Sequence, residues 1–131
     1  MTSPPAGIGV VHLGQVAINV HNLARATAFY RDTLGLPLLF SAGELAFFDC
    51  GGVRLMLSLP EKAEFDHPSS ILYFAVADIV VAHRQLRARG VRIEAEPHIV
   101  ARMPASDIWM AFFRDSEDNL LALMNEAPHS E

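Results

Sequence analysis

The sequence is poor in cysteine and in long apolar runs. Cys50 is its single cysteine, so no disulfide can form within one chain. This is typical of proteins in a reducing compartment and favours a cytoplasmic location. The longest apolar run, residues 71–77, is far shorter than the about 20 residues of a membrane-spanning helix. The first residues also lack the basic and then apolar stretches of a secretory signal peptide.

Basic residues are too few and too scattered for a polyanionic partner. The formal net charge is −5 and the sequence pI is about 5.6. Nucleic acids and anionic membrane surfaces select basic patches, so neither is an expected partner. The sequence also lacks a glycine-rich phosphate loop, a nucleophile elbow and the paired histidines of a helical zinc motif.

Apolar periodicity predicts a first group of elements before residue 60. Asn22 has the side chain of a helix N-cap, and the apolar positions of residues 23–34 fall on one helical face. Gly35 is typical of the residue after a helix, and Pro37 prevents continuation. Short strands are predicted at residues 15–20, 37–40, 45–50 and 53–59, with turns at 43–44 and 51–52.

The same pattern restarts after a polar, proline-containing linker at residues 61–70. Asp78 is the expected N-cap of a second helix, which ends at Gly90. Residues 96–107 contain Pro97 and Pro104 and are predicted to form a mobile connection. The other predicted strands are residues 71–76, 91–95, 109–114 and 120–125.

The two groups are one pattern written twice. Asn22 and Asp78 are separated by 78 − 22 = 56 residues, and the same offset relates Leu23 to Ile79. This self-similarity indicates an internal duplication. The sequence thus predicts an α+β fold of two tandem βαβββ modules. Their expected bounds are 12–60 and 71–126, with a linker at 61–70 and tails at 1–11 and 127–131.

Tandem βαβββ modules resemble the vicinal oxygen chelate superfamily, which includes glyoxalase I, extradiol dioxygenases and bleomycin-resistance proteins. The resemblance rests on VAINVHNLARATAFYRDTLGL in the first module, and on YFAVADI, ARGV and FFRDSEDNLLAL in the second. It implies a U-shaped, partly closed mixed sheet with a ligand cavity. Members of this superfamily commonly form dimers, so the resemblance also implies a homodimer.

Members of this superfamily that bind a metal use four ligands on the sheet. Carried over, those positions fall on Gln15, Met56, Ile71 and Ala122. Methionine is a soft thioether, and isoleucine and alanine have no donor atom, so at most one hard ligand is kept. No metal or other cofactor is therefore expected, and a rearranged divalent site is the open alternative.

Neighbours of these positions on the same strands share their face because side chains alternate along a strand. The cavity is expected to bind a small molecule, although it could instead be filled as plain core. Arg54 could bind an anionic group or pair with Asp49 across the hairpin. The ligand-binding candidates are Gln15, Asn19, Arg54, Met56, Ser58, Tyr73, His98, Trp109, Ala122 and Met124.

Two segments bear on catalysis. His98 and Asp107 are the candidates for an acid/base pair on the predicted 96–107 connection, although such a histidine is often a plain surface residue. The acidic stretch RDSEDNLLALMNE resembles a calcium loop in its oxygen spacing, but Leu120 stands where that loop needs glycine. A hairpin turn is the better interpretation, because Asp and Asn bond their own backbone and tolerate left-handed conformations.

Three functions are compatible with these features. The favoured one is a metal-independent protein that binds a small apolar or aromatic molecule in the sheet cavity. The alternative is a metal-dependent enzyme, such as a glyoxalase I-like lyase, an epimerase or a ring-cleaving dioxygenase, with a rearranged metal site. The third is a purely structural partner domain.

Overall fold

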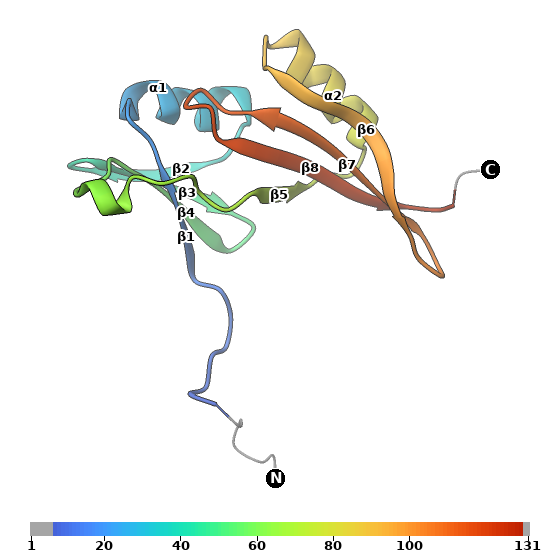
Figure 1. Ribbon diagram of the computed structural model, residues 1–131, viewed down its shortest axis with the longest axis horizontal. Helices are drawn as coiled ribbons and strands as arrows, with labels where there is room; N and C mark the ends of the chain where they lie inside the picture. Colours follow the sequence, from blue (N-terminus) through green and yellow to red (C-terminus); the bar gives the residue numbers. More distant parts are fainter. Residues whose placement is uncertain (1–6, 130–131) are drawn as a thin grey trace.

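The computed structural model describes residues 7–129, which form two four-stranded mixed sheets (Figure 1). In the first sheet the strand order is β1-β4-β3-β2; β1 runs parallel to β4, and the remaining neighbours are antiparallel. Its strands are β1 (Gln15–Asn19), β2 (Leu38–Ala42), β3 (Leu45–Cys50) and β4 (Val53–Ser58).

The second sheet repeats this topology with the order β5-β8-β7-β6. Again the first strand runs parallel to the last, and the other pairs are antiparallel. Its strands are β5 (Leu72–Ala75), β6 (Ile93–Arg102), β7 (Asp107–Arg114) and β8 (Leu120–Ala127). The predicted α+β fold of two βαβββ modules is confirmed, and the strands described do not close into a barrel.

Both helices begin at the predicted caps. Asn22 Oδ1 accepts a hydrogen bond from the Arg25 amide at 2.9 Å, at the start of α1 (Leu23–Ala28). Asp78 Oδ1 accepts from the Val80 and Val81 amides at the start of α2 (Ile79–Ala88). These bonds satisfy amides that the first helical turn leaves free.

The end of the first helix differs from the prediction. The wider π-helical turn η1 (Phe29–Thr33) replaces the last part of the expected α-helix, and Gly35 then reverses the chain with φ +79°. Glycine suits this position because a Cβ disfavours positive φ. A short 3-10 turn, η2 (Ala63–Phe65), lies in the linker. None of the helices described has the length and apolarity that a membrane crossing would require.

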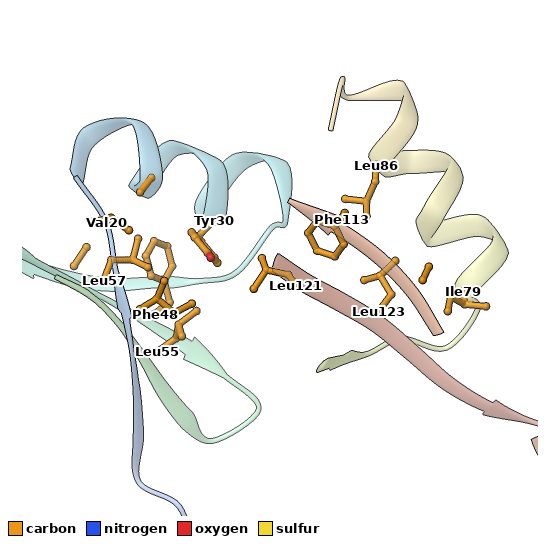
Figure 2. Close-up of a cluster of buried hydrophobic side chains, with 14 residues drawn as sticks. Val20, Tyr30, Phe48, Leu55, Leu57, Ile79, Leu86, Phe113, Leu121 and Leu123 are labelled. Carbon is orange, nitrogen blue, oxygen red and sulfur yellow. The ribbon is translucent and has the colours of Figure 1, made fainter. Parts of the chain in front are cut away.

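The core lies between each sheet and its helix. The two helices cover the same side of the molecule (Figure 1). Figure 2 shows buried side chains of this core, which come from both the strands and the helices. Burial of each large aliphatic or phenylalanine side chain contributes about 1.5–3 kcal/mol relative to exposure. The largest labelled members are Val20, Tyr30, Phe48, Leu55 and Leu57 on one module and Ile79, Leu86, Phe113, Leu121 and Leu123 on the other.

The predicted mobile connection at residues 96–107 is wrong. β6 runs through Pro97 and ends at Arg102, and only a tight turn separates it from β7. Within sheets proline is confined to edge strands and bulges, and β6 is an edge strand. The pairing register also shifts between Ala95 and His98, on either side of the proline. Elsewhere the predicted strand ends differ by one or two residues.

Candidate functional site

Each sheet has one face turned toward its helix and one turned away, which we call the open face. The first open face centres on Gln15, Ala17, Phe47, Arg54 and Met56. Strand alternation puts them there, because their neighbours Ile18, Leu55 and Leu57 point into the core. Pairing aligns Gln15 with Arg54 and Ala17 with Met56. The predicted grouping of Gln15, Arg54 and Met56 on one face thus matches the pairing register.

Arg54 is oriented by neutral neighbours. Its Nε donates to Gln15 Oε1 at 2.9 Å, and its central carbon lies 5.4 Å from the centre of the Phe47 ring. The Gln15 amide in turn donates to Met56 Sδ at 3.6 Å. These side chains therefore form one contiguous arrangement. Phe47 was not among the predicted residues, and its contact with Arg54 is found only once the register is known.

The alternative role of Arg54, a pair with Asp49, is wrong. Asp49 lies opposite Arg54 in the hairpin, yet its Oδ1 accepts the Gly52 amide at 3.2 Å and closes the turn. No hydrogen bond or ion pair joins the two side chains in the part of the chain that the structure describes. The positive charge of Arg54 therefore stays available on the open face.

Asn19 and Ser58 lie opposite each other at one end of the first open face. The Asn19 side chain donates to the carbonyls of Phe65 at 2.5 Å and His67 at 3.0 Å. Its backbone amide donates to Ser69 Oγ at 3.2 Å. Asn19 therefore fastens the linker to β1, and its amide group is occupied by protein acceptors.

The second open face carries Tyr73, Phe112, Ala122 and Met124, with His98 at its edge. Tyr73 and Phe112 flank Ala122 on the two neighbouring strands, and their ring centres are only 6.2 Å apart. The rings therefore lean together above Ala122, which is fully buried. The His98 ring lies 6.3 Å from Phe112. Phe112 was also missed from the sequence, because its place opposite Ala122 depends on the pairing of β7 with β8.

His98 and Asp107 do not form the predicted acid/base pair. His98 pairs with Met110, three residues or about 10 Å along β7 from Asp107. Its ring nitrogen Nδ1 lies 2.7 Å from the Glu96 carbonyl. Asp107 is fully buried, and its carboxylate meets Arg102 at 3.2 Å and His129 at 2.8 Å.

Trp109 was a ligand-binding candidate from the sequence, but it does not lie on the second open face. It alternates with Phe112 along β7 and packs, half-buried, against the core instead of facing the second open face. His129, which the sequence placed in a tail, anchors the end of β8 instead. Its pKa is raised by its contacts with the Pro104 carbonyl and the Asp107 carboxylate.

The four positions implied by the family do not fit a divalent ion. Gln15 and Met56 are in contact, but one offers an amide and the other a thioether. Ile71 has no donor atom, and Ala122 lies beneath two aromatic rings. Within residues 7–129 the structure contains no group of three or more His, Cys, Asp or Glu side chains that could hold a metal ion.

The acidic stretch after β7 is a hairpin turn, as the sequence indicated. Asp115 Oδ1 accepts the amides of Glu117 and Asn119, each at 2.8 Å. Asp118 has φ +69°, a left-handed conformation that Asp tolerates better than most residues. The oxygens of Asp115 are occupied by backbone and side-chain donors, which leaves no calcium loop.

This turn also joins the two modules, a role that sequence reasoning missed. Glu117 reaches α1 of the other module and accepts the His21 and Asn22 amides, each at 2.7 Å, and Arg25 Nε at 2.8 Å. The Tyr30 hydroxyl donates to Asp115 Oδ2 at 2.6 Å. Burial, reinforced by the Asp115 charge, raises the pKa of Tyr30, so the hydroxyl stays a donor.

An apolar groove lies between the two modules. It has a volume of about 440 Å³ and borders a smaller cavity of about 240 Å³. Tyr73 lines both, as does Cys50, whose thiol pKa is raised first by burial and then by the Asp49 charge. A protonated thiol is a poor nucleophile, so Cys50 is a wall of the groove and has no catalytic signature.

Comparisons with known proteins agree on the fold. The model of the family described as Glyoxalase/Bleomycin resistance protein/Dioxygenase superfamily matches residues 12–123. An uncharacterized protein of Bacillus subtilis, YraH, is 28% identical over 83% of this chain and 94% of its own length. Metallothiol transferase FosB of Staphylococcus haemolyticus is 28% identical over half of each chain.

Solved structures extend this likeness. Lactoylglutathione lyase from Agrobacterium tumefaciens has a TM-score of 0.66 and 25% identity, covering 94% of this chain and 96% of that one. An integron cassette protein from V. cholerae has a TM-score of 0.74 and 20% identity over 90% and 97% of the two chains. At such identities the second likeness is one of fold.

Proposed function

Because this chain belongs to the glyoxalase/bleomycin resistance protein/dioxygenase superfamily, we propose that it binds a small apolar or aromatic organic molecule on its open faces, without a family-type metal ion. One observation carries the proposal: Tyr73 and Phe112 meet above Ala122, where the resemblance implies a ligating glutamate. The position that would complete a metal centre is instead part of an aromatic surface.

The composition of the open faces supports this role. Phe40 and Tyr73 are 48% and 45% exposed, although large aromatic side chains gain most from burial. Polar groups stand beside them at Gln15 and Arg54. Apolar surface with a few placed polar groups is the usual make-up of small-molecule sites. A plain core domain would not leave this surface uncovered.

We also propose that the chain forms a homodimer in which a second copy covers the segment before β1. The segment that leads into β1 extends away from the body of the molecule (Figure 1). Its side chains Ile8, Val10 and Val11 are 97%, 79% and 87% exposed. Such an apolar segment is stabilised by contact with a partner surface. Light scattering after size-exclusion chromatography tests this: a dimer near twice 14.4 kDa is expected, and a monomer at micromolar concentration counts against it.

Methyl NMR on methionine-labelled protein tests the binding proposal directly. Met56 reports the first open face, Met110 and Met124 report the second, and Met103 at the exposed β6–β7 turn is the internal control. A panel of small aromatic molecules is expected to shift Met56 or the Met110–Met124 pair while Met103 stays unchanged. In a second sample labelled at the leucine methyls, a response confined to Leu36 and Leu123 would move the site to the groove.

Metal content is measured on the same material by elemental analysis of protein purified without chelators. Far less than one divalent ion per chain is expected. A stoichiometric ion that is lost on Gln15→Ala would overturn the metal-independent proposal.

A metal-dependent enzyme is the rival proposal, and the likeness to metallothiol transferase FosB and to a lactoylglutathione lyase favours it. Turnover of α-keto thiohemiacetals, acyl-CoA thioesters and catechols is therefore assayed with added Mg²⁺, Mn²⁺, Ni²⁺ and Zn²⁺. We expect no turnover above background. Metal-stimulated turnover that disappears on Gln15→Ala but persists on Glu126→Ala would establish the rival.

A further inference from the structure

The Arg54 guanidinium is held in place before any ligand arrives. Gln15 fixes its Nε edge, and the Phe47 ring supports its flat face. Gln15 is itself held by its contact with Met56. A free arginine loses considerable rotamer entropy when it binds a ligand. Because Arg54 is already restrained, a ligand that meets it has a smaller entropic penalty to overcome.

The other edge of this guanidinium has no protein partner. Its nitrogens Nη1 and Nη2 have no acceptor among residues 7–129, and Asp49 directs its carboxylate to the Gly52 amide. Six of the other eight arginines are paired with carboxylates. Those in salt bridges are Arg25, Arg31, Arg87, Arg92, Arg102 and Arg114. Arg54 is thus an oriented cation with a free hydrogen-bonding edge.

The same open face also carries apolar surface. Phe40 stacks on Phe47 with ring centres 4.5 Å apart and planes inclined by 26°. Met56 and Ala17 continue the surface across β4 and β1. A ligand that uses both parts has a flat apolar body for the rings and an oxyanion for the guanidinium. The arginine fork matches the two oxygens of a carboxylate in bidentate geometry.

We infer that the first open face binds a small organic anion, an aromatic carboxylate, with Arg54 as the anchor of its charged group. This inference rests on the proposed function and adds the chemical class of the ligand. The negative charge of Asp49 opposes the binding of an anion, but this carboxylate is directed toward the Gly52 amide of the hairpin turn. The inference also assigns Gln15 a positioning role, because it orients Arg54 without reaching the ligand itself.

Matched probes separate charge from apolar contact. The Met56 methyl signal is titrated with 2-naphthoate, with the neutral 2-naphthylmethanol, and with inorganic phosphate. Naphthoate is expected to bind at least about tenfold more tightly than the alcohol, since hydrogen bonds to charged groups are roughly twice as strong as neutral ones. Phosphate alone is expected to bind more weakly than naphthoate because it lacks the apolar body.

Variants assign the effect to Arg54. Arg54→Gln is expected to abolish the preference for naphthoate over the alcohol. Arg84→Gln is the matched control, since Arg84 is an exposed residue of α2 outside the open faces and the charge change is the same. Arg54→Lys keeps the charge but not the fork, so an intermediate loss is expected. Gln15→Ala keeps the cation but frees it, and is expected to weaken naphthoate binding by a smaller factor than Arg54→Gln.

Outcomes distinguish the inference from the proposed function. If Met56 responds equally to both naphthyl probes, or if Arg54→Gln keeps the preference, the inference is wrong and the proposed function stands. If no probe shifts Met56, Met110 or Met124, both are wrong. Thermal unfolding of each variant tests whether the fold is retained. If Arg54→Gln unfolds, the loss of naphthoate binding in Gln15→Ala is compared with wild type instead.

Discussion

Removing the Glu117 carboxylate is expected to loosen the junction between the modules. This side chain is only 2% exposed, and it accepts two amides and the Arg25 guanidinium from α1 of the other module. In Glu117→Ala the His21 and Asn22 amides lose their acceptor, at about 1 kcal/mol each. Arg25 is 58% exposed, so water replaces its lost partner, and that pair adds no more than about 1 kcal/mol.

The free energy of unfolding should therefore fall by about 2–3 kcal/mol. For a domain of this size, that corresponds to a decrease in Tm of roughly 6–15 °C. Differential scanning calorimetry measures it. The matched control is Glu126→Ala, an exposed glutamate of β8 outside the salt bridges of the described residues, with an expected change within about 0.5 kcal/mol. A Tm for Glu117→Ala that equals that of the control would refute the reasoning.

The same comparison has a defined pH dependence. Burial alone would raise the pKa of Glu117, but the Asn22 and His21 amides and the Arg25 guanidinium lower it overall. A carboxyl whose folded pKa is lowered stabilises the fold above its ordinary value of 4.5. The stability difference between wild type and Glu117→Ala should thus be complete at neutral pH and shrink as the pH falls below 4.5.

Three further changes test separate contacts. Tyr30→Phe removes the hydroxyl bonded to Asp115, and denaturant unfolding should show a loss of about 1–3 kcal/mol with unchanged m. The pKa of His129 is raised, so an NMR titration of its ring should give a midpoint above 6.5, and Asp107→Asn should lower that midpoint. The contact between His129 and Asp107 stabilises the fold below pH 6.5, and this stabilisation is lost as the pH rises through the folded pKa. Cys50 has a raised thiol pKa and should react with a disulfide reagent at pH 8 far more slowly in the folded than in the unfolded protein.

Local signals explain why much of the fold could be predicted. The caps at Asn22 and Asp78 bond to amides only two or three residues away, so their chemistry is visible in a short stretch of sequence. The 56-residue repeat then supplies the order of the elements in the second module from that in the first. The π-helical turn at Phe29–Thr33 has no such signal, because the same apolar spacing fits an α-helix.

Long-range pairing explains most of what the sequence did not predict. Pro97 is a strong local breaker, and only the position of β6 at the sheet edge makes it harmless. Glu117 and His21 are 96 positions apart, so nothing near either residue indicates the contact. The same limit applied to the site. Gln15, Arg54 and Met56 came from alternation along strands, whereas Phe47 and Phe112 needed the register between strands.

The two aromatic rings above Ala122 constrain how this sequence can evolve. The single change Ala122→Glu does not create a metal centre of the family type, because the new carboxylate would be buried beneath Tyr73 and Phe112 without a cation. Burying an unpaired charge is strongly destabilising. Changes at Met56 and Ile71 would bring no benefit before that step. Such an intermediate is therefore less stable and still lacks a complete set of ligands of the family type.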